Sequence, residues 1–387
     1  MLFTLPAAFL LSSKQLPFPF KLFHSKSPFF TMAVSTRPPA NGFVAQARKV
    51  YNPIGFSKGY NFVLWFIFAG AMFGFSLARM MYLDYYGVYC NPNSAGGNGA
   101  GPGECFSYNK KDLYKIGIKM HLYTIIPAAL LVVFQFVPFI RYKALLFHRM
   151  NGYIVIILAI IGTVGAIIIA PVSFGGSLII RGWVGAASIM FIGSMGISLW
   201  NIKTLQLEQH RAWMLRAWFY AGSIITVRII MIISAMVMSK NPSFRQPMQC
   251  DKIATFYDDS ASLVAKYPVC EDTDAWVAVQ GDMSGESAEN IATALSLGFS
   301  LGVWLALAIH AIGIEVYLRL TPAESERLRK ISYQRQQERG FKNPGSAGLT
   351  VDRLGDAEKW YPGNEVEVEA LPPTKQQHSE SSFVDTA

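Results

Sequence analysis

EQHRAWMLRAWFYAGSIITVRIIMIISAMVM, residues 208–238, is the stretch that decides the fold class. It opens with basic and aromatic residues and continues as an apolar run to Met238. As a helix, the run from Ala217 to Met238 would span ~33 Å at ~1.5 Å per residue, which is enough to cross a bilayer. Arg228 lies inside this run. An arginine at such a depth costs ~2.5 kcal/mol or more, so it usually faces the interior of a helix bundle. The stretch therefore predicts a membrane protein with a polar interior.

The composition of the 387-residue chain agrees with this prediction. Only 15% of the residues are charged, and the apolar residues gather into long runs, which is typical of membrane proteins. The formal net charge is +9, and basic residues at the ends of apolar runs favour contact with anionic lipid headgroups. The sequence contains no DNA- or RNA-binding motif. We therefore expect the lipid bilayer as partner, and no nucleic acid; a lipophilic small molecule and a partner membrane protein are further candidates.

Six apolar runs are long enough to cross a membrane, since a spanning helix needs ~20 residues. Gly193-x-x-Gly196 and Gly298-x-x-x-Gly302, inside two of these runs, offer small faces on which helices can pack closely. The predicted fold is therefore all-α, a polytopic membrane bundle of six transmembrane helices within residues 61–320. The runs lie at 61–83, 117–140, 153–171, 183–200, 212–238 and 291–318.

The regions outside the bundle are predicted to be tails. Residues 1–60 are rich in Pro, Ser and aromatic residues, and we expect a disordered tail there. Leu2–Leu11 has the apolar character of a signal peptide core, but no basic residue precedes it. The other alternative is an over-extended start upstream of Met32. Residues 321–387 should begin as a charged cytosolic helix and become disordered after Gly340.

The short links between the runs carry an orientation signal. The 141–152 and 201–211 links are each basic, whereas Arg181 is the single basic residue of the 172–182 link. Basic loops are retained in the cytosol. Both basic links, and with six spans both chain termini, are therefore predicted to be cytosolic.

The four cysteines indicate the same orientation independently. Cys90 and Cys105 follow the first run, and Cys250 and Cys270 follow the fifth, so all four fall on the non-cytosolic side. Disulfides persist on that side. Four cysteines allow three pairings. We predict Cys90–Cys105 and Cys250–Cys270, because each of these bonds closes a short loop.

Two of the runs are opened by similar motifs. One is His-Arg-x-Trp-Met-x-Arg at residues 210–216, and the other is His-Arg-x-x-Gly at residues 148–152. Together with the later arginine of the fifth run, these motifs resemble a multi-pass membrane family known as domain of unknown function 2306. The resemblance covers residues 60 to 320. The family label implies neither a substrate nor a reaction.

The two motifs define a candidate polar site. We expect both His-Arg pairs to converge at the cytosolic face, with Arg228 deeper in the same bundle. Arg228 lies 18 positions after His210, which is ~1800°, or about five full turns, at ~100° per residue, so the two residues share one helix face. The candidate residues are His148, Arg149, His210, Arg211, Trp213, Arg216 and Arg228.

Arg228 needs a polar partner if it is buried in the membrane. If Arg228 has a functional role, it binds an anionic substrate or a haem propionate. If its role is structural, it is a buried residue that makes several hydrogen bonds. The candidate partners within the protein are Asp84, Thr163, Ser223, Thr226, Glu315 and backbone carbonyls.

Four histidines lie in or beside the runs, and two imidazoles from facing helices can ligate haem iron. The ascorbate-reducible dihaem cytochromes are six-helix membrane proteins of similar topology. His121 lies ~11 Å outward of the middle of its run and His310 lies ~8 Å inward of the middle of its own, so these two cannot share a haem without large helix shifts. His148 and His210 share the cytosolic side and are the candidate ligands of one haem b. Alternatively, each of them caps a helix start and binds headgroups.

No motif in the sequence indicates a reaction. A phosphate-binding glycine loop, a zinc-binding HExxH helix, a paired-cysteine metal site and a nucleophile elbow do not occur. The favoured hypothesis is a non-redox membrane protein with an accessory, transport or biosynthetic-partner role. The alternatives are a haem-binding membrane oxidoreductase and a membrane enzyme that acts on a lipophilic substrate.

Overall fold

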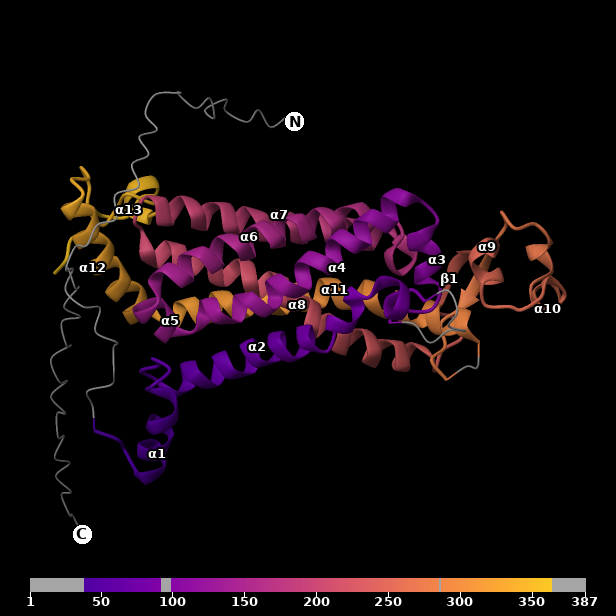
Figure 1. Ribbon diagram of the computed structural model, residues 1–387, viewed down its shortest axis with the longest axis horizontal. Helices are drawn as coiled ribbons and strands as arrows, with labels where there is room; N and C mark the ends of the chain where they lie inside the picture. Colours follow the sequence, from indigo (N-terminus) through magenta and orange to yellow (C-terminus); the bar gives the residue numbers. More distant parts are fainter. Residues whose placement is uncertain (1–37, 92–98, 285–286, 364–387) are drawn as a thin grey trace, which may run out of the picture.

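The computed structural model describes residues 38–91, 99–284 and 287–363. Within this part of the chain, six helices are long and apolar enough to cross a membrane. They run roughly along one axis of an elongated bundle (Figure 1), and the predicted all-α membrane fold is confirmed. The six are α2 (Gly59–Leu77), α4 (Asp112–Val132), α6 (Leu145–Ile169), α7 (Leu178–Lys203), α8 (Leu207–Met238) and α11 (Ala288–Arg319).

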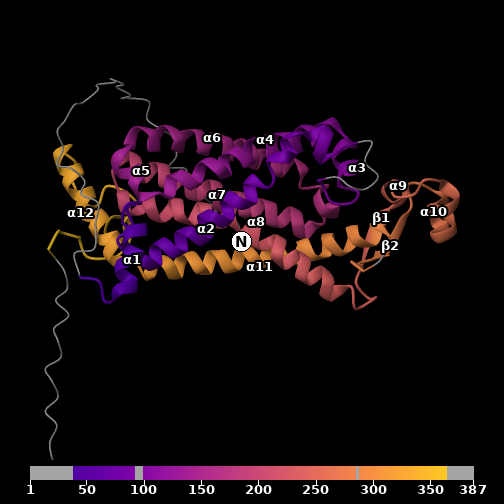
Figure 2. The ribbon, with the colours of Figure 1, turned by 60° about the horizontal axis from the view of Figure 1, so that its bottom comes forward.

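Shorter elements gather at the two ends of the bundle (Figures 1 and 2). The end that we name the α12 end holds α1 (Gly42–Tyr51), η3 (Val133–Phe136), α5 (Pro138–Lys143), α12 (Pro322–Glu338) and α13 (Val351–Leu354). The opposite end, which we name the disulfide end, holds η1 (Met80–Leu83), the π-helical turn η2 (Tyr85–Tyr89), α3 (Glu104–Asn109), η4 (Ser173–Gly176), β1 (Arg245–Gln249), α9 (Cys250–Ala254), α10 (Ser260–Lys266), η5 (Pro268–Glu271) and β2 (Trp276–Gln280). The strands β1 and β2 pair antiparallel.

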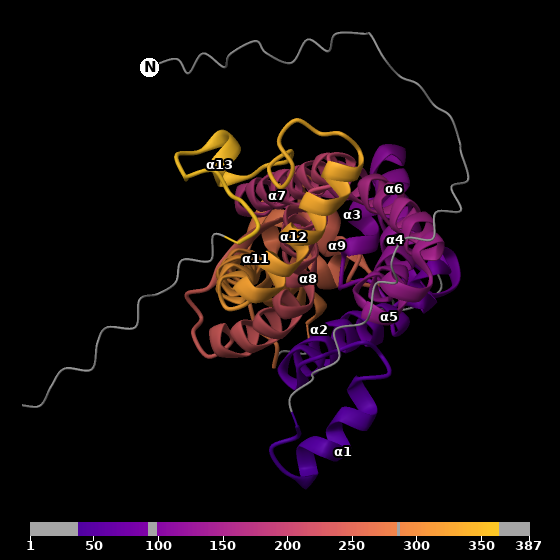
Figure 3. The same ribbon diagram turned by 90° about the vertical axis from the view of Figure 1, so that its left-hand side faces the viewer.

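The helix α8 packs against α7 on one side and α11 on another (Figure 3). Glycine makes the α8–α11 contact close. A methyl group added to Gly298 would come within 2.5 Å of the Met231 carbonyl oxygen, and one added to Gly302 within 3.2 Å of the Val227 carbonyl oxygen. The predicted packing face at these two glycines is confirmed. The predicted face at residues 193–196 is wrong, because the positions of added methyl groups there have no neighbour within 4 Å in the described structure.

The helices α4 and α6 form a second close pair, in which a methyl group on Gly165 would lie 2.6 Å from the Gly117 carbonyl oxygen. By contrast, α2 lies at the rim of the bundle (Figure 3), and Ser76 is its one buried residue in the described structure. Many of its apolar side chains are exposed, among them Val63, Phe66, Ile67 and Phe73, as expected of a helix with a face toward lipid.

Several helix boundaries differ from those predicted. The second span ends early because Val137 is extended (φ −80°, ψ 114°) and Pro138 opens the separate helix α5, as the conformational restriction before proline favours. The third helix already begins at Leu145, so the His148 motif lies inside its first turns. The first span ends at Leu77, six residues before the predicted end at 83.

Two segments predicted to be disordered tails are instead structured. Residues 42–51 form α1, and residues 341–363, which we name the tail segment, fold back onto the α12 end and include α13. The proposed signal peptide core, Leu2–Leu11, lies outside the described residues.

Both predicted disulfides are confirmed. Cys90 is bonded to Cys105 and Cys250 to Cys270, with Cα–Cα distances of 5.5 and 5.2 Å. The first bond lies within a cluster of buried tyrosines, and the second lies in a small apolar core beneath β1 and β2. All four cysteines therefore lie at the same end of the bundle.

Candidate functional site

The second His-Arg motif lies in the first turns of α8, beside α7. His210 faces α7, because its Nδ1 lies 2.7 Å from Ser198 Oγ and 3.1 Å from the Ser198 carbonyl oxygen. Arg211 faces α11, where its Nη2 donates to Tyr317 Oη at 3.4 Å and to Thr321 Oγ1 at 3.3 Å. The motif thus joins three helices at the α12 end.

Arg141, on the short helix α5, lies among other charged residues at this end. The backbone of α5 is anchored by a 3.0 Å hydrogen bond from Phe139 N to the Ile54 carbonyl oxygen. Arg141 interacts electrostatically with Arg211, Glu324 and Arg327. Burial lowers the pKa of the Arg141 guanidinium below its usual range, because a low-dielectric surrounding disfavours the charged form.

The one carboxylate of this group is already engaged. Both oxygens of Glu324 accept hydrogen bonds of 2.8 Å from Arg327, which also donates to Tyr142 Oη at 3.3 Å. Burial opposes the ionisation of Glu324, but the hydrogen bonds and charge of Arg327 hold its pKa below its usual value. Glu324 therefore remains an anion matched to Arg327, and the charges of Arg141 and Arg211 are left in excess.

Buried polar atoms without a partner also concentrate at this end. Within the described structure, the atoms of this kind at the α12 end include Asn52 Oδ1, Trp65 Nε1, Gln135 Nε2, Arg141 Nε, His148 Nδ1, Arg211 Nη1 and Trp213 Nε1. Five carry an N–H, and His148 Nδ1 can carry one as well. We name the six nitrogen-bearing residues, Trp65, Gln135, Arg141, His148, Arg211 and Trp213, the donor cluster. Leaving a buried donor unpaired costs about 1–3 kcal/mol.

The remaining candidate residues differ in whether they belong to the donor cluster. His148 interacts electrostatically with Arg141 and His210, so it belongs with the cluster. Arg149 is exposed and lies outside it. Arg216 is satisfied by Glu315, to which it donates two hydrogen bonds of 2.5 and 3.0 Å, and its guanidinium lies 4.6 Å from the Trp213 ring.

Arg228 is not brought into this cluster. It lies 18 residues beyond His210, which is ~27 Å along the helix axis. The two residues are therefore too far apart to belong to one site. Its guanidinium lies 5.2 Å from the Phe174 ring and 5.5 Å from the Phe299 ring, and its Nη1 lies 3.9 Å from Met231 Sδ. Arg228 therefore belongs to the half of the bundle nearer the disulfide end.

The side chains expected to partner Arg228 are engaged elsewhere. Glu315 pairs with Arg216, Asp84 accepts from Gly87 N, and the hydroxyls of Thr163 and Ser223 bond to carbonyl oxygens of their own helices. Thr226 Oγ1 lies 2.8 Å from His310 Nε2. Aromatic rings accept the cation instead through their negative faces.

The histidines differ in what they can still bind. Both ring nitrogens of His310 are used, by Thr226 and by the Phe219 carbonyl oxygen at 2.8 Å. His121 Nδ1 bonds the Gly162 carbonyl oxygen at 2.8 Å. Among the described residues, no group of three or more His, Cys, Asp or Glu side chains could hold a metal ion. His148 and His210 remain the candidate pair.

Sequence reasoning missed four members of the site: Trp65, Gln135, Arg141 and Glu324. Arg141 was used only as one of the basic residues that predict orientation. Pro138, three residues before it, indicates the start of a separate helix, and such a helix could place Arg141 against the bundle. Trp65 lies inside the first apolar run, where no motif marks it. No local pattern marks Gln135 or Glu324, because their role arises from helices that meet only in the folded chain.

Comparisons with known proteins give one match. No curated protein and no solved structure matches the chain at a significant level. A family model described as "Predicted membrane protein (DUF2306)" matches residues 118–249. This range is narrower than the predicted 60 to 320, but it contains both His-Arg motifs, Arg141 and Arg228. Over residues 118–249, the chain therefore resembles the family of predicted membrane proteins described as DUF2306.

Proposed function

We propose that this protein is a non-redox, multi-pass membrane protein that binds an anionic small molecule at the α12 end, in a transport or accessory role. The observation that carries this proposal is the donor cluster, in which buried N–H groups without a partner in the described structure lie at the same end of the bundle as the guanidinium groups of Arg141 and Arg211. Within the described structure, neither Arg141 nor Arg211 has a carboxylate within ion-pair distance. A bound anion would supply the missing acceptors and separate two like charges.

The chemistry of the cluster favours a carboxylate or a phosphate with an apolar body. Guanidinium groups bind both of these anions through paired hydrogen bonds. The indole N–H groups of Trp65 and Trp213 add neutral donors, while their rings offer an apolar surface. A neutral ligand would leave the two guanidinium charges unmatched.

We further propose that the α12 end faces the cytosol. The basic links lie at this end, and both disulfides lie at the other. A tag placed after Ala387 should then be digested by protease added to sealed microsomes, whose exterior is the cytosolic face. A tag that stays protected until detergent is added would contradict this orientation.

Ligand stabilisation of the purified protein tests the binding proposal. Octanoate, octyl phosphate and octanol share one chain and differ in charge. At least one of the two anions should raise the thermal midpoint of the wild-type protein, because a ligand that binds only the folded state stabilises it, and octanol should not. Arg141→Gln and Arg211→Gln should each reduce the effect of that anion.

Arg149→Gln is the matched control, because Arg149 is an exposed arginine at the same end. It should keep the full response to the anion. An equal response in wild-type protein, Arg141→Gln and Arg211→Gln, or stabilisation by octanol as strong as by the anions, would refute the proposal.

A second candidate function, haem b binding, is favoured by the two histidines of the motifs. Ser198 holds Nδ1 of His210, as outer partners of metal-bound histidines do, and His148 Nδ1 is buried without a partner in the described structure. His148 and His210 would hold the iron, and Arg141 and Arg211 would pair with propionates. Protein purified from haem-replete cells should then show a Soret band that shifts on dithionite reduction; a spectrum without this band removes the candidate.

A further inference from the structure

The tail segment is fastened to the turn between α7 and α8. Gln206, which is fully buried, accepts hydrogen bonds from the backbone N–H groups of Ala347 at 3.0 Å and Gly348 at 3.1 Å. Its Nε2 donates to the Gly345 carbonyl oxygen at 2.8 Å. The Asn201 amide oxygen accepts from Leu349 N at 2.8 Å. These bonds place residues 345–349 directly over the end of α7.

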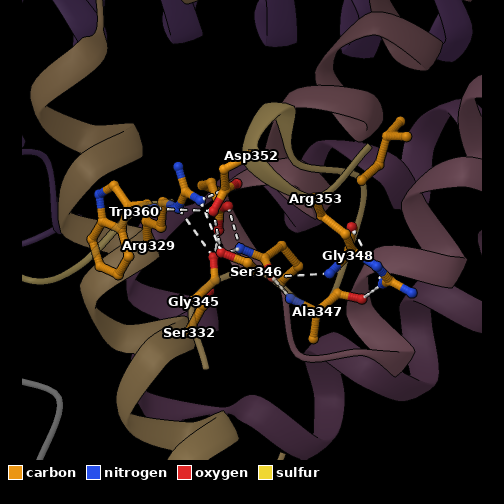
Figure 4. Close-up of polar contacts among 12 residues, drawn as sticks. Arg329, Ser332, Gly345, Ser346, Ala347, Gly348, Asp352, Arg353 and Trp360 are labelled. Atoms are coloured by element: carbon orange, nitrogen blue, oxygen red, sulfur yellow. Dashed lines mark hydrogen bonds and ion pairs between the residues drawn. The ribbon is translucent and has the colours of Figure 1, made fainter. Parts of the chain in front are cut away.

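A salt bridge and an aromatic contact stabilise the outer part of the segment (Figure 4). Arg329 Nη2 lies 2.6 Å from Asp352 Oδ1, and its guanidinium lies 4.7 Å from the Trp360 ring. Ser346 also donates to Asp352. Arg353 points the other way, toward the carbonyl oxygens of Ala347 and Gly348. Asp352 is therefore paired with Arg329, while Arg353 lacks an acidic partner in the described structure.

A cavity of about 300 Å³ lies between the tail segment and the end of α7. Its lining combines two cations, two hydroxyls, one amide and an indole, from Lys342, Arg353, Thr204, Ser346, Asn343 and Trp200. No Asp or Glu lines it. The lining also includes Phe341, so it combines two positive charges with an apolar surface, which suits a phosphate group that carries an apolar body.

The cavity lies at the level where a membrane-spanning helix leaves the bilayer. Trp200 stands in the last turn of α7 and is 40% exposed, in the manner of interfacial tryptophans. On α13, Val351 and Leu354 are 65% and 60% exposed. Exposed apolar side chains of this kind are typical of an element that lies in the headgroup region of a bilayer.

We propose that this cavity is a binding site for the phosphate group of an anionic membrane lipid. Lys342 and Arg353 supply the charge, the Asn343 amide supplies a hydrogen bond, and Trp200 packs against the glycerol region. The site is separate from the donor cluster and does not depend on it. Free phosphate offers the same chemistry, so the test includes it.

Direct titration of the full-length protein in detergent tests the site. The probes are dioctanoyl phosphatidic acid, dioctanoylglycerol, which lacks the phosphate, and inorganic phosphate. Phosphatidic acid should bind, and dioctanoylglycerol should bind at least about 10-fold more weakly. Lys342→Gln/Arg353→Gln should weaken phosphatidic acid binding by about 10-fold or more, since each basic residue near anionic headgroups contributes about 1 kcal/mol.

Two controls keep the result specific. Lys359→Gln removes a basic residue of the same segment that does not line the cavity, and it should bind like wild type. Lys342→Gln alone, at an exposed position, should already weaken binding without loosening the segment. If inorganic phosphate displaces phosphatidic acid, the cavity binds free phosphate. If phosphatidic acid binds and inorganic phosphate does not, the cavity binds a lipid headgroup. Equal binding of phosphatidic acid by the wild type and the double variant overturns the proposal.

Discussion

Gln206→Leu should release the tail segment while leaving the bundle folded. Leucine fills a similar volume but removes three hydrogen bonds to the segment, those with Gly345 O, Ala347 N and Gly348 N. At about 1 kcal/mol for each bond, the docked segment should lose about 3 kcal/mol, which is about a 140-fold larger opening equilibrium. Glu208, which also accepts a hydrogen bond from Gln206, keeps its hydrogen bond from Ser332 in the variant.

Hydrogen exchange measures this opening directly, since exchange of a docked amide reports the free energy of local unfolding. Peptides covering residues 341–354 should exchange about 140-fold faster in the variant, and peptides from α8 and α11 should be unchanged. Gln337→Leu makes the same chemical change at the exposed neighbour of Gln336 and should exchange like wild type. Unchanged exchange in Gln206→Leu would show that these bonds do not hold the segment.

Three further perturbations test other parts of the structure. Burial opposes ionisation of Asp352, but the hydrogen bonds from Ser346, Trp360 N and Arg329 hold its pKa below the usual range. Its contribution to stability is therefore fully present above the unfolded pKa of about 3.9 and is lost only as the pH falls through the lower folded pKa. Exchange of the tail segment should therefore show no loss of protection from this group between pH 8 and pH 5, beyond the intrinsic pH dependence of exchange, while Asp352→Asn should speed exchange across that range; a wild-type segment already released at pH 5 would contradict this. Replacing Cys250 and Cys270 by serine should destabilise the region around β1 and β2 by about 2–4 kcal/mol, visible as faster limited proteolysis there, and equal cleavage rates would count against it. Gly298→Val should lower the thermal midpoint, because the added atoms meet a backbone oxygen of α8, whereas Gly193→Val, with open space around it, should not; equal midpoints would contradict the close helix contact.

The architecture was largely predictable because the bilayer imposes strong constraints on sequence. Each spanning helix needs a long apolar run, and all six runs become helices in the described structure. The disulfides were predictable because each pair lies within one loop, far along the chain from the other pair. The helix break at Pro138 was also encoded, since proline disfavours helical backbone at the residue before it, although the continuous apolar run obscured it.

The candidate site was only partly predictable. Helical periodicity predicted His210 and Arg228 on one face, but it says nothing about depth, and the two residues lie ~27 Å apart along α8. His210 contacts Ser198 of α7, whereas Arg228 lies over the Phe299 ring of α11. The rings of Phe174 and Phe299, which receive Arg228, come from other elements. The docking of the tail segment depends mainly on side-chain bonds to backbone groups, as at Gln206. Such bonds leave no residue pattern in the partner segment, and its Pro, Gly and Ser content therefore resembled that of a disordered tail.

The most direct test of the account is a titration of octyl phosphate into the purified protein. It is carried out in the Lys342→Gln/Arg353→Gln background, so that the cavity under the tail segment does not contribute. Adding Arg211→Gln should weaken binding by about 10- to 100-fold, since a hydrogen bond to a charged group contributes about 1.5–3 kcal/mol. Adding Arg149→Gln instead should leave the dissociation constant unchanged. The same dissociation constant with and without Arg211→Gln would contradict the claim that the donor cluster binds an anion.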